Sequence, residues 1–182
     1  PSWSYVAADC FAGAAELVRY LFKLGHRKIA HIGGSEGSFA QQIFEGYCRG
    51  LEECQLPLDT SLVIRTRADE KSGALAAAQL LSSGKEFTAI HTASDPLAMG
   101  VMTCCRERNV AIPERISVTG FSDIMVAKQL SVPLTTFREP TAEIGAESVR
   151  LLLEKISGTP GASPGHLKLP GVVVDRSSCK AI

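Results

Sequence analysis

The sequence has 182 residues, of which 45% are hydrophobic, and its 19 Lys and Arg side chains balance 19 Asp and Glu side chains. This length and hydrophobic content are enough for a buried core, arranged as one domain or as two small lobes. Because no run of eighteen apolar residues occurs, we expect no membrane-spanning segment. Charges of both signs are interspersed, so this segment alone is not expected to bind DNA tightly. The first four residues do not resemble the start of a secretory signal.

Six cysteines are scattered along the chain without paired C-x-x-C spacing. Their density is below that of secreted domains held together by disulfides. We interpret them as reduced thiols of a cytoplasmic protein, packed as small hydrophobic side chains.

Residues suited to catalysis or metal binding form no recognisable pattern. The four histidines are scattered, and Gly-x-Ser-x-Gly, Walker and paired-carboxylate motifs are absent from the sequence. Gly33-Gly34 is similar to part of a phosphate loop but lacks the Lys-Ser/Thr that completes one. We therefore expect no enzyme activity, no metal ion and no cofactor.

The first half of the chain is expected to alternate between helix and strand. Apolar residues recur at spacings of three and four before Gly25, which predicts a helix that this glycine ends. Ser38-x-x-Gln41 has the form of a capping box that opens a second helix. The expected elements are helices at 14–24, from 38 onward and at 71–81, and strands at 27–32, 62–66 and 87–92.

The second half continues the alternation. Asp95 is expected to cap a helix that has Pro96 in its first turn and ends near Asn109. Pro140 is expected to open a helix whose inner face would be formed by Val149, Leu152, Leu153 and Ile156. The remaining expected elements are strands at 116–121, 134–137 and 167–174, with a linker at 159–165.

Strands that alternate with helices across short loops predict an α/β fold with a doubly wound parallel sheet and right-handed crossovers. Ligands of such sheets bind beyond the carboxyl ends of the strands. The loops at 33–39, 67–69, 93–95 and 121–123 are therefore expected to surround one crevice.

Several sequence motifs lie in a specific order along the chain. They are Leu24 to Gly34, Phe44-Glu45-Gly46-Tyr47, Ala93 to Gly100, Val110 to Pro113, Ile116 to Phe121 and Pro133 to Thr136. In this order and spacing the chain resembles the lactose/galactose repressor (LacI) family of bacterial transcription regulators. The resemblance implies an effector-binding core with a fold like that of type I periplasmic binding proteins. In that fold two lobes, joined by three chain crossings, close on a small metabolite such as a sugar.

The resemblance implies one complete lobe and part of a second. Residues 1–26 would be a remnant of the N-terminal lobe, 27–136 the C-terminal lobe, 137–158 a return to the N-terminal lobe, and 159–182 a linker and the final strand of the C-terminal lobe. The family's helix-turn-helix head has no counterpart here, so operator DNA would be bound only through a preceding, missing part. We expect the strand near 5–8 to lack neighbours and the helix at 14–24 to lack much of its packing surface.

The resemblance also indicates candidate effector contacts. Asp9 and Glu139 match polar positions near the lobe crossings, although a turn-stabilising role suits Asp9 equally and a helix-start role suits Glu139. Phe39 lies in one of the crevice loops. Four further candidates depart from the family pattern: Ile43 replaces a charged residue, Ala68 an aromatic one, Ser94 an Asn and Ser122 an acid. These departures predict a less charged, roomier pocket and an unusual effector, or a core that has lost ligand sensing and is regulated by a partner.

An apolar patch in the irregular stretch after the strand at 116–121 predicts a homodimer. It consists of Ile124, Met125, Val126 and Leu130. Loops are normally polar, so these apolar side chains are expected to be buried against another surface. In related regulators the equivalent stretch contributes to a dimer interface, and the alternative is that these side chains tuck under their own lobe.

A periplasmic sugar-binding protein of a transport system is the main rival, because it would share the fold. The motifs around Gly25 to Ala30 and Ile116 to Asp123 favour the regulator. The cysteines do so too, because they show no pairing suited to an oxidising compartment.

Overall fold

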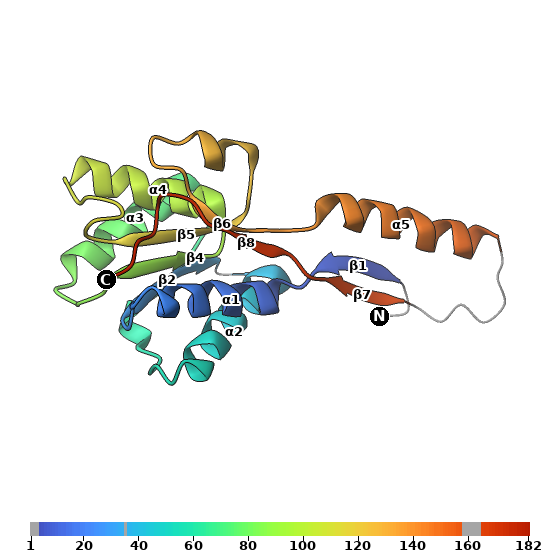
Figure 1. The fold of residues 1–182 in the computed structure, drawn as a ribbon, viewed down its shortest axis with the longest axis horizontal. Coiled ribbons are helices and arrows are strands. Elements are labelled where there is room, and N and C mark those ends of the chain that lie inside the picture. Colours follow the sequence, from blue (N-terminus) through green and yellow to red (C-terminus); the bar gives the residue numbers. More distant parts are fainter. Residues whose placement is uncertain (1–3, 35, 158–164) are drawn as a thin grey trace.

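The computed structural model describes residues 4–34, 36–157 and 165–182. It consists of a large unit built on a six-stranded sheet and a narrow arm that projects from one end of it (Figure 1). The elements are β1 Tyr5–Ala8, α1 Cys10–Lys23, β2 Ile29–Gly34, α2 Ser38–Glu53, η1 Thr60–Leu62, β3 Val63–Thr66, α3 Glu70–Ser82, β4 Ala89–Thr92, α4 Asp95–Glu107, β5 Ser117–Ser122, η2 Met125–Gln129, β6 Thr135–Arg138, α5 Thr141–Ile156, β7 His166–Leu169 and β8 Val172–Val174.

The large sheet has the strand order β3-β2-β4-β5-β6-β8. All neighbouring strands are parallel except β8, which runs antiparallel to β6. Helices α3 and α4 cover one face and α1 and α2 the other (Figure 1). Every residue of the central strand β4 is buried, as expected for a strand covered on both faces. The expected doubly wound α/β fold is confirmed.

Helix α1 belongs to the large unit, so its expected assignment to a remnant N-terminal lobe is wrong. It packs along α2, where Gly46 faces the Phe11 carbonyl and Gly50 faces the Ala15 carbonyl so closely that a Cβ atom at either glycine would clash. Leu17, Val18 and Leu21 of α1 have no exposed surface. The helix therefore keeps its packing surface, and the boundary expected near residue 26 lies instead near Asp9.

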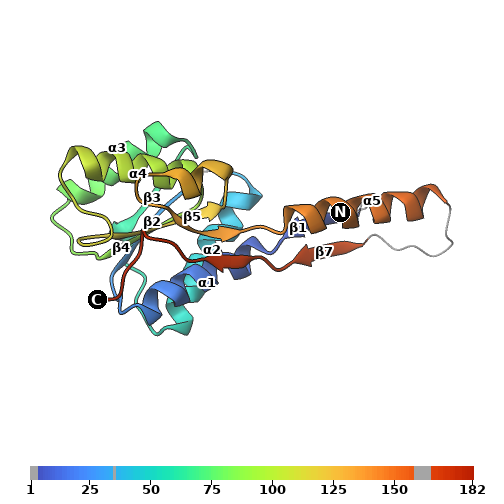
Figure 2. The same cartoon turned by 45° about the horizontal axis from the view of Figure 1, so that its top comes forward.

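The arm is formed by β1, β7 and α5 (Figure 2). Strand β1 pairs in parallel with β7, which contradicts the expectation that it would lack neighbours. The final strand expected at 167–174 is split between β7 in the arm and β8 in the large sheet, with Pro170 and Gly171 between them. Most of the linker expected at 159–165 lies outside the described residues.

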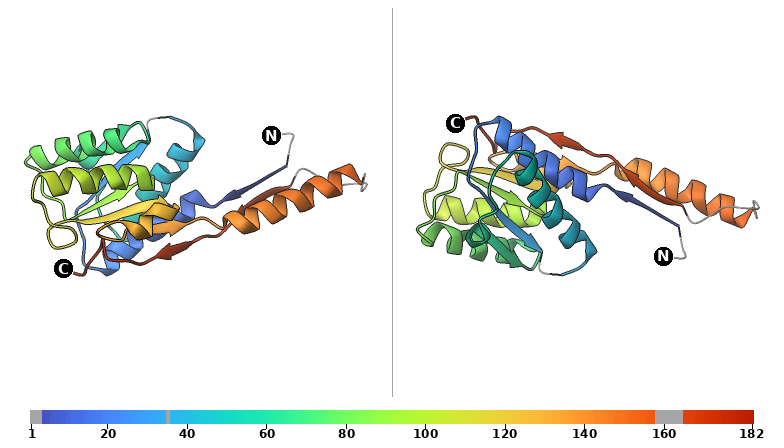
Figure 3. Two further views of the ribbon diagram at one scale, coloured as in Figure 1. Left: turned by 90° about the horizontal axis from the view of Figure 1, so that it is seen from above. Right: turned by 90° about the horizontal axis from the view of Figure 1, so that it is seen from below.

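Helix α5 contributes no buried residue, so the inner face expected for it is wrong. Its side chains Val149, Leu152, Leu153 and Ile156 are 57–72% exposed. The physical reason is the position of the helix, which contacts β1 and lies beyond the end of the large sheet (Figure 3). None of the helices formed by described residues combines the length and hydrophobicity that a bilayer span requires.

The segment after β8 is hydrogen-bonded to two neighbouring parallel strands, β5 and β6. The Ser178 hydroxyl donates to the Val118 carbonyl and accepts from the Thr135 amide, at 2.6 and 2.8 Å. This side chain is completely buried between β5 and β6.

Candidate functional site

The effector crevice is expected beyond the carboxyl ends of the parallel strands. Strand β6 leads from the large sheet directly into the arm, so its carboxyl end and those of the strands parallel to it face the arm (Figure 1). The loops after β2, β3, β4 and β5 therefore lie at one edge of the sheet, as the sequence predicted.

Ser94 follows β4 and caps α4. Its hydroxyl oxygen accepts a hydrogen bond from the Leu97 amide at 3.3 Å. Asp95, expected to be the cap, is instead the first helical residue and has no exposed surface. Its carboxylate accepts from the Ile124 amide at 2.8 Å and from the Thr136 hydroxyl at 2.6 Å. Ser94 thus has the capping role that the sequence suggested for Asp95, and Asp95 makes buried contacts with other elements instead.

Ser122 and Asp123 form a turn at the end of β5. Both have positive φ angles, 106° and 54°, which residues other than glycine rarely adopt. The Asp123 carboxylate forms ion pairs of 2.6 Å with Arg138 and with Arg176. These guanidinium groups hold the pKa of Asp123 below its ordinary value despite the opposing effect of burial. Ser122 is partly exposed at the crevice edge.

The expected contacts on the β2 and β3 side of the crevice differ in accessibility. Phe39 is 43% exposed, and its ring meets Phe121 edge to face with centroids 5.9 Å apart. Ala68 is exposed in the loop after β3. Ile43 has no exposed surface and belongs to the main core cluster, which contradicts its expected role as a crevice contact. An isoleucine at this helical position packs inward where a charged residue would require solvent or a partner.

Asp9 and Glu139 are brought together near the junction with the arm. The Cys10 thiol lies 3.9 Å from a Glu139 carboxylate oxygen. Burial, then Glu139 and then Asp9, raises the pKa of this thiol to about 12, so it is an unreactive neutral group. Asp9 also caps α1 by accepting from the Ala12 amide at 3.1 Å. The junction therefore carries two carboxylates, and the turn-stabilising role considered for Asp9 is observed.

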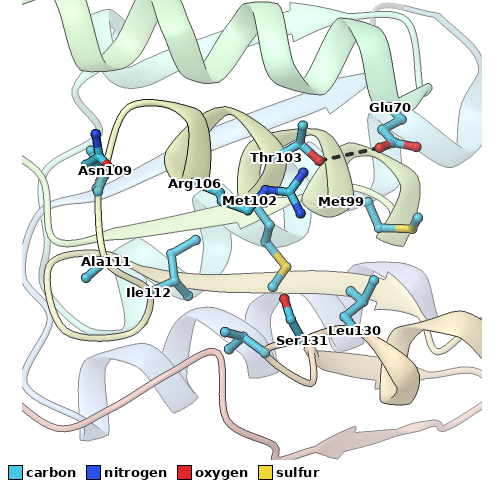
Figure 4. Close-up of a pocket in the computed structure, with 12 residues that line it drawn as sticks. Glu70, Met99, Met102, Thr103, Arg106, Asn109, Ala111, Ile112, Leu130 and Ser131 are labelled. Atoms are coloured by element: carbon cyan, nitrogen blue, oxygen red, sulfur yellow. Dashed lines mark hydrogen bonds between the residues drawn. The ribbon is translucent and has the colours of Figure 1, made fainter.

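No cluster of three or more His, Cys, Asp or Glu side chains suited to a metal ion occurs within the described parts of the chain. All six cysteines are free. A cavity of about 580 Å³ lies beside α4 (Figure 4). Its lining comes from one side of α4, from Glu70 at the start of α3 and from the loops at 109–112 and 130–132, and includes Met99, Met102 and Leu130.

The residues expected at a dimer interface do not behave as one patch. Met125 is 78% exposed. Ile124 and Leu130 are partly buried and pack against the core of their own unit. Leu130 also borders the cavity beside α4.

Sequence reasoning missed three residues that shape the crevice edge, namely Thr136, Arg138 and Arg176. Arg138 is the register partner of Ser122 on the neighbouring strand. Their involvement depends on β6 lying beside β5 and on the return of the chain after β8. No motif around Arg138 or Arg176 signals this placement, and the motif Pro133 to Thr136 does not indicate the contact between Thr136 and Asp95.

Comparison with known proteins identifies the family. Residues 18–179 match the periplasmic binding protein-like domain. The ribose operon repressor of Haemophilus influenzae is 34% identical over 137 residues, covering 75% of this chain and 41% of that protein. The repressor CytR of Escherichia coli is 30% identical over 178 residues, covering 97% of this chain and 52% of that protein. A LacI family regulator from Enterococcus faecium, solved with bound ribose, has a TM-score of 0.89 at 28% identity and covers 98% of this chain and 66% of that one.

The chain belongs to the LacI family and corresponds to the effector-binding core of its transcription regulators. It spans about half the length of the curated relatives it matches. These relatives are transcription regulators rather than enzymes.

Proposed function

We propose that this chain is the effector-binding core of a cytoplasmic transcription repressor, which binds a sugar or related metabolite and catalyses no reaction. The observation that carries the proposal is the crevice edge, where Ser94 after β4, Ser122 at the end of β5 and the exposed Phe39 in the first turn of α2 lie beyond the carboxyl ends of parallel strands. Hydroxyl groups and an aromatic ring are the side chains that bind polar, weakly charged ligands. Family membership supports the same function.

The effector is expected to be weakly charged overall. Ile43 is buried, Ala68 has no functional group, and the Asp123 carboxylate is paired with two arginines in a cluster of net charge +1. Two further carboxylates, Asp9 and Glu139, lie near the junction with the arm. They suit ligand hydroxyl or amine groups that donate hydrogen bonds.

Ligand binding would act by biasing the arrangement of the parts on either side of the crevice. An effector shifts such an equilibrium only through its different affinity for the two arrangements. Operator DNA would be bound by a helix-turn-helix in a preceding segment. The change in arrangement caused by the effector would be transmitted to that segment through a homodimer. The exposed Met125 supports a dimer contact, and Leu130, five residues further along the chain, borders the cavity beside α4 (Figure 4).

A thermal-shift screen tests the proposed function. D-ribose, other sugars, sugar acids, nucleosides and amino acids are added in excess to the chain, and a binding compound raises the unfolding temperature by mass action. Ser122→Phe should abolish that shift, because a ring at the crevice edge fills the ligand's space. Ser61→Phe, at an exposed residue of η1, is the control that should retain it. Shifts that are identical in both variants would remove Ser122 from the site.

A sugar-binding protein of a transport system is the second candidate. It would use the same crevice without a DNA-binding segment. The gene sequence upstream of Pro1 separates the two: a helix-turn-helix supports the repressor, and a signal peptide rules it out.

A further inference from the structure

We propose that Asp95 is a positioning residue whose buried carboxylate fixes the Ser122–Asp123 turn at the edge of the crevice. That this turn faces an effector rests on the proposed function. The fixing of the turn itself is a property of the chain that can be tested without a ligand.

The carboxylate connects three elements that are distant in sequence. It starts from the first turn of α4, accepts from the Ile124 amide directly after the turn, and accepts from Thr136 on β6. Gly120 on β5 leaves the space for it, because a Cβ atom there would meet the Asp95 carboxylate. A carboxylate this deeply buried is tolerated only when its oxygens receive hydrogen bonds.

Asp95 is not required to start its own helix. Ser94 already caps α4 through the Leu97 amide. The Asp95 side chain turns instead toward the Ile124 amide in the loop after β5 and toward Thr136 on β6, and it accepts a hydrogen bond from each. Its contacts therefore serve the loop and β6 rather than the helix end.

The turn needs such a restraint. Two consecutive residues other than glycine have positive φ, and such conformations persist only where the surroundings determine them. Asp123 is held from one side by Arg138 and Arg176. The Ile124 amide, held by Asp95, fixes the other end of the strained pair.

The electrostatic surroundings of Asp95 allow the restraint to be tested by changing the pH. Burial raises the pKa of Asp95 to about 6, opposed by the hydrogen bonds from Thr136 and Ile124. Among the described charged side chains, Asp123 raises the pKa of Asp95 further. Asp123 is itself paired with Arg138 and Arg176. The restraining group is thus titratable in a mild pH range.

The test is nuclear magnetic resonance of the ¹⁵N-labelled 182-residue chain. The Ile124 amide resonance should shift with a midpoint near pH 6, and the Ser122 and Asp123 amides should shift with it. The internal control is the Ser72 amide, which donates to the partly exposed Asp69 at the same 2.8 Å distance. Because hydrogen bonds lower the pKa of Asp69 from its ordinary value, the Ser72 resonance should shift at a lower pH than the Ile124 resonance.

Two variants separate positioning from general stability. Asp95→Asn replaces one acceptor oxygen with a donor group, so amide hydrogen exchange at residues 122–124 should accelerate roughly ten- to a hundredfold while exchange in α1 and α2 stays unchanged. Thr136→Val should loosen the same residues and Thr136→Ser should preserve them. If Asp95→Asn does not fold, this Thr136 pair decides. An unaltered turn, or exchange that rises equally throughout the chain, overturns the proposal.

Discussion

The imidazoles of His31 and His91 share a hydrogen bond of 3.0 Å between their Nδ1 atoms, deep in the large unit. The two residues are register partners on β2 and β4, and neither has more than 1% of its surface exposed. Both Nε2 atoms lack a partner among the described residues. Burial lowers the pKa of His91 to about 4 and lowers that of His31 in the same direction, with His91 and then Arg65 adding to the effect on His31.

Acid should therefore destabilise the chain through this pair. The unfolded state takes up protons near pH 6.5, whereas the folded His91 imidazole remains neutral to about pH 4 and the pKa of His31 is also lowered. The contribution of the pair to stability is therefore complete above pH 6.5 and decreases as the pH falls below it. Each histidine contributes at most about 1.4 kcal/mol per pH unit. In urea unfolding, His91→Asn should reduce the slope of stability against pH between 6.5 and 4. Equal slopes above pH 7.5 are the control, and equal slopes below pH 6.5 would contradict the prediction.

Asp95 should show the opposite pH trend. Its pKa is about 6 in the folded protein and its ordinary value is 3.8, so the folded state takes up a proton first as pH falls. The stability that this proton adds is complete below about pH 4 and is lost as pH rises through 6. The free energy of unfolding of the wild type, minus that of Asp95→Asn, should therefore increase from pH 7 to pH 4. A constant difference would show that Asp95 does not titrate in this range.

Close packing of α3 against α4 depends on Gly100. A Cβ atom at this position would meet the Glu70 carbonyl, which is backbone and cannot move aside without shifting the helix. Gly100→Ala should cost about 1–3 kcal/mol of stability. Gly145→Ala on α5 is the matched control, because nothing lies within 4 Å of its Cβ position. That substitution should stabilise by about 0.5–1 kcal/mol, and urea unfolding measures both.

The cap at Ser94 should be energetically significant. Ser94→Ala removes the acceptor of the Leu97 amide and should cost about 1 kcal/mol of stability. Ser38, the first residue of α2, provides the comparison, because that helix start has no side-chain cap hydrogen bond. Ser38→Ala should have a much smaller effect in the same denaturant titration. Equal losses would mean that the Ser94 bond is not responsible.

Dimerisation should depend on Met125. If its exposed side chain is buried against a second copy, Met125→Asp places two like charges in apolar surroundings and should produce monomers. Leu58→Asp, at another exposed apolar residue outside the cavity beside α4, should leave the dimer intact. Light scattering gives the mass of each. A monomeric wild type, or a dimeric Met125→Asp variant, would falsify the dimer contact.

Most elements of the fold could be predicted from hydrophobic periodicity, because strands such as β4 and helices such as α4 have strong local patterns. The elements against which α1 and α5 pack could not be predicted in this way. Both helices carry apolar residues at helical spacing, but α1 is buried against Gly46 and Gly50 and α5 is exposed. Periodicity identifies an apolar face without identifying what covers it.

The candidate site was predictable to the level of its loops. Ser94 and Ser122 could be placed at strand ends from the alternation of elements alone. The roles of Asp95 and Asp123 could not be predicted, since their partners Thr136, Arg138 and Arg176 come from β6 and the segment after β8. The predicted capping box at Ser38 was wrong because Gly37 is the residue that precedes α2, and Gln41 bonds to Glu45 instead.

The junction made by Ser178 has a consequence for the order of folding. The Val118 carbonyl and the Thr135 amide are hydrogen-bonded by a side chain that lies 60 and 43 residues further along the chain. Until that segment docks, both groups are open to water. We therefore expect the interior between β5 and β6 to be sealed only when the chain returns after β8.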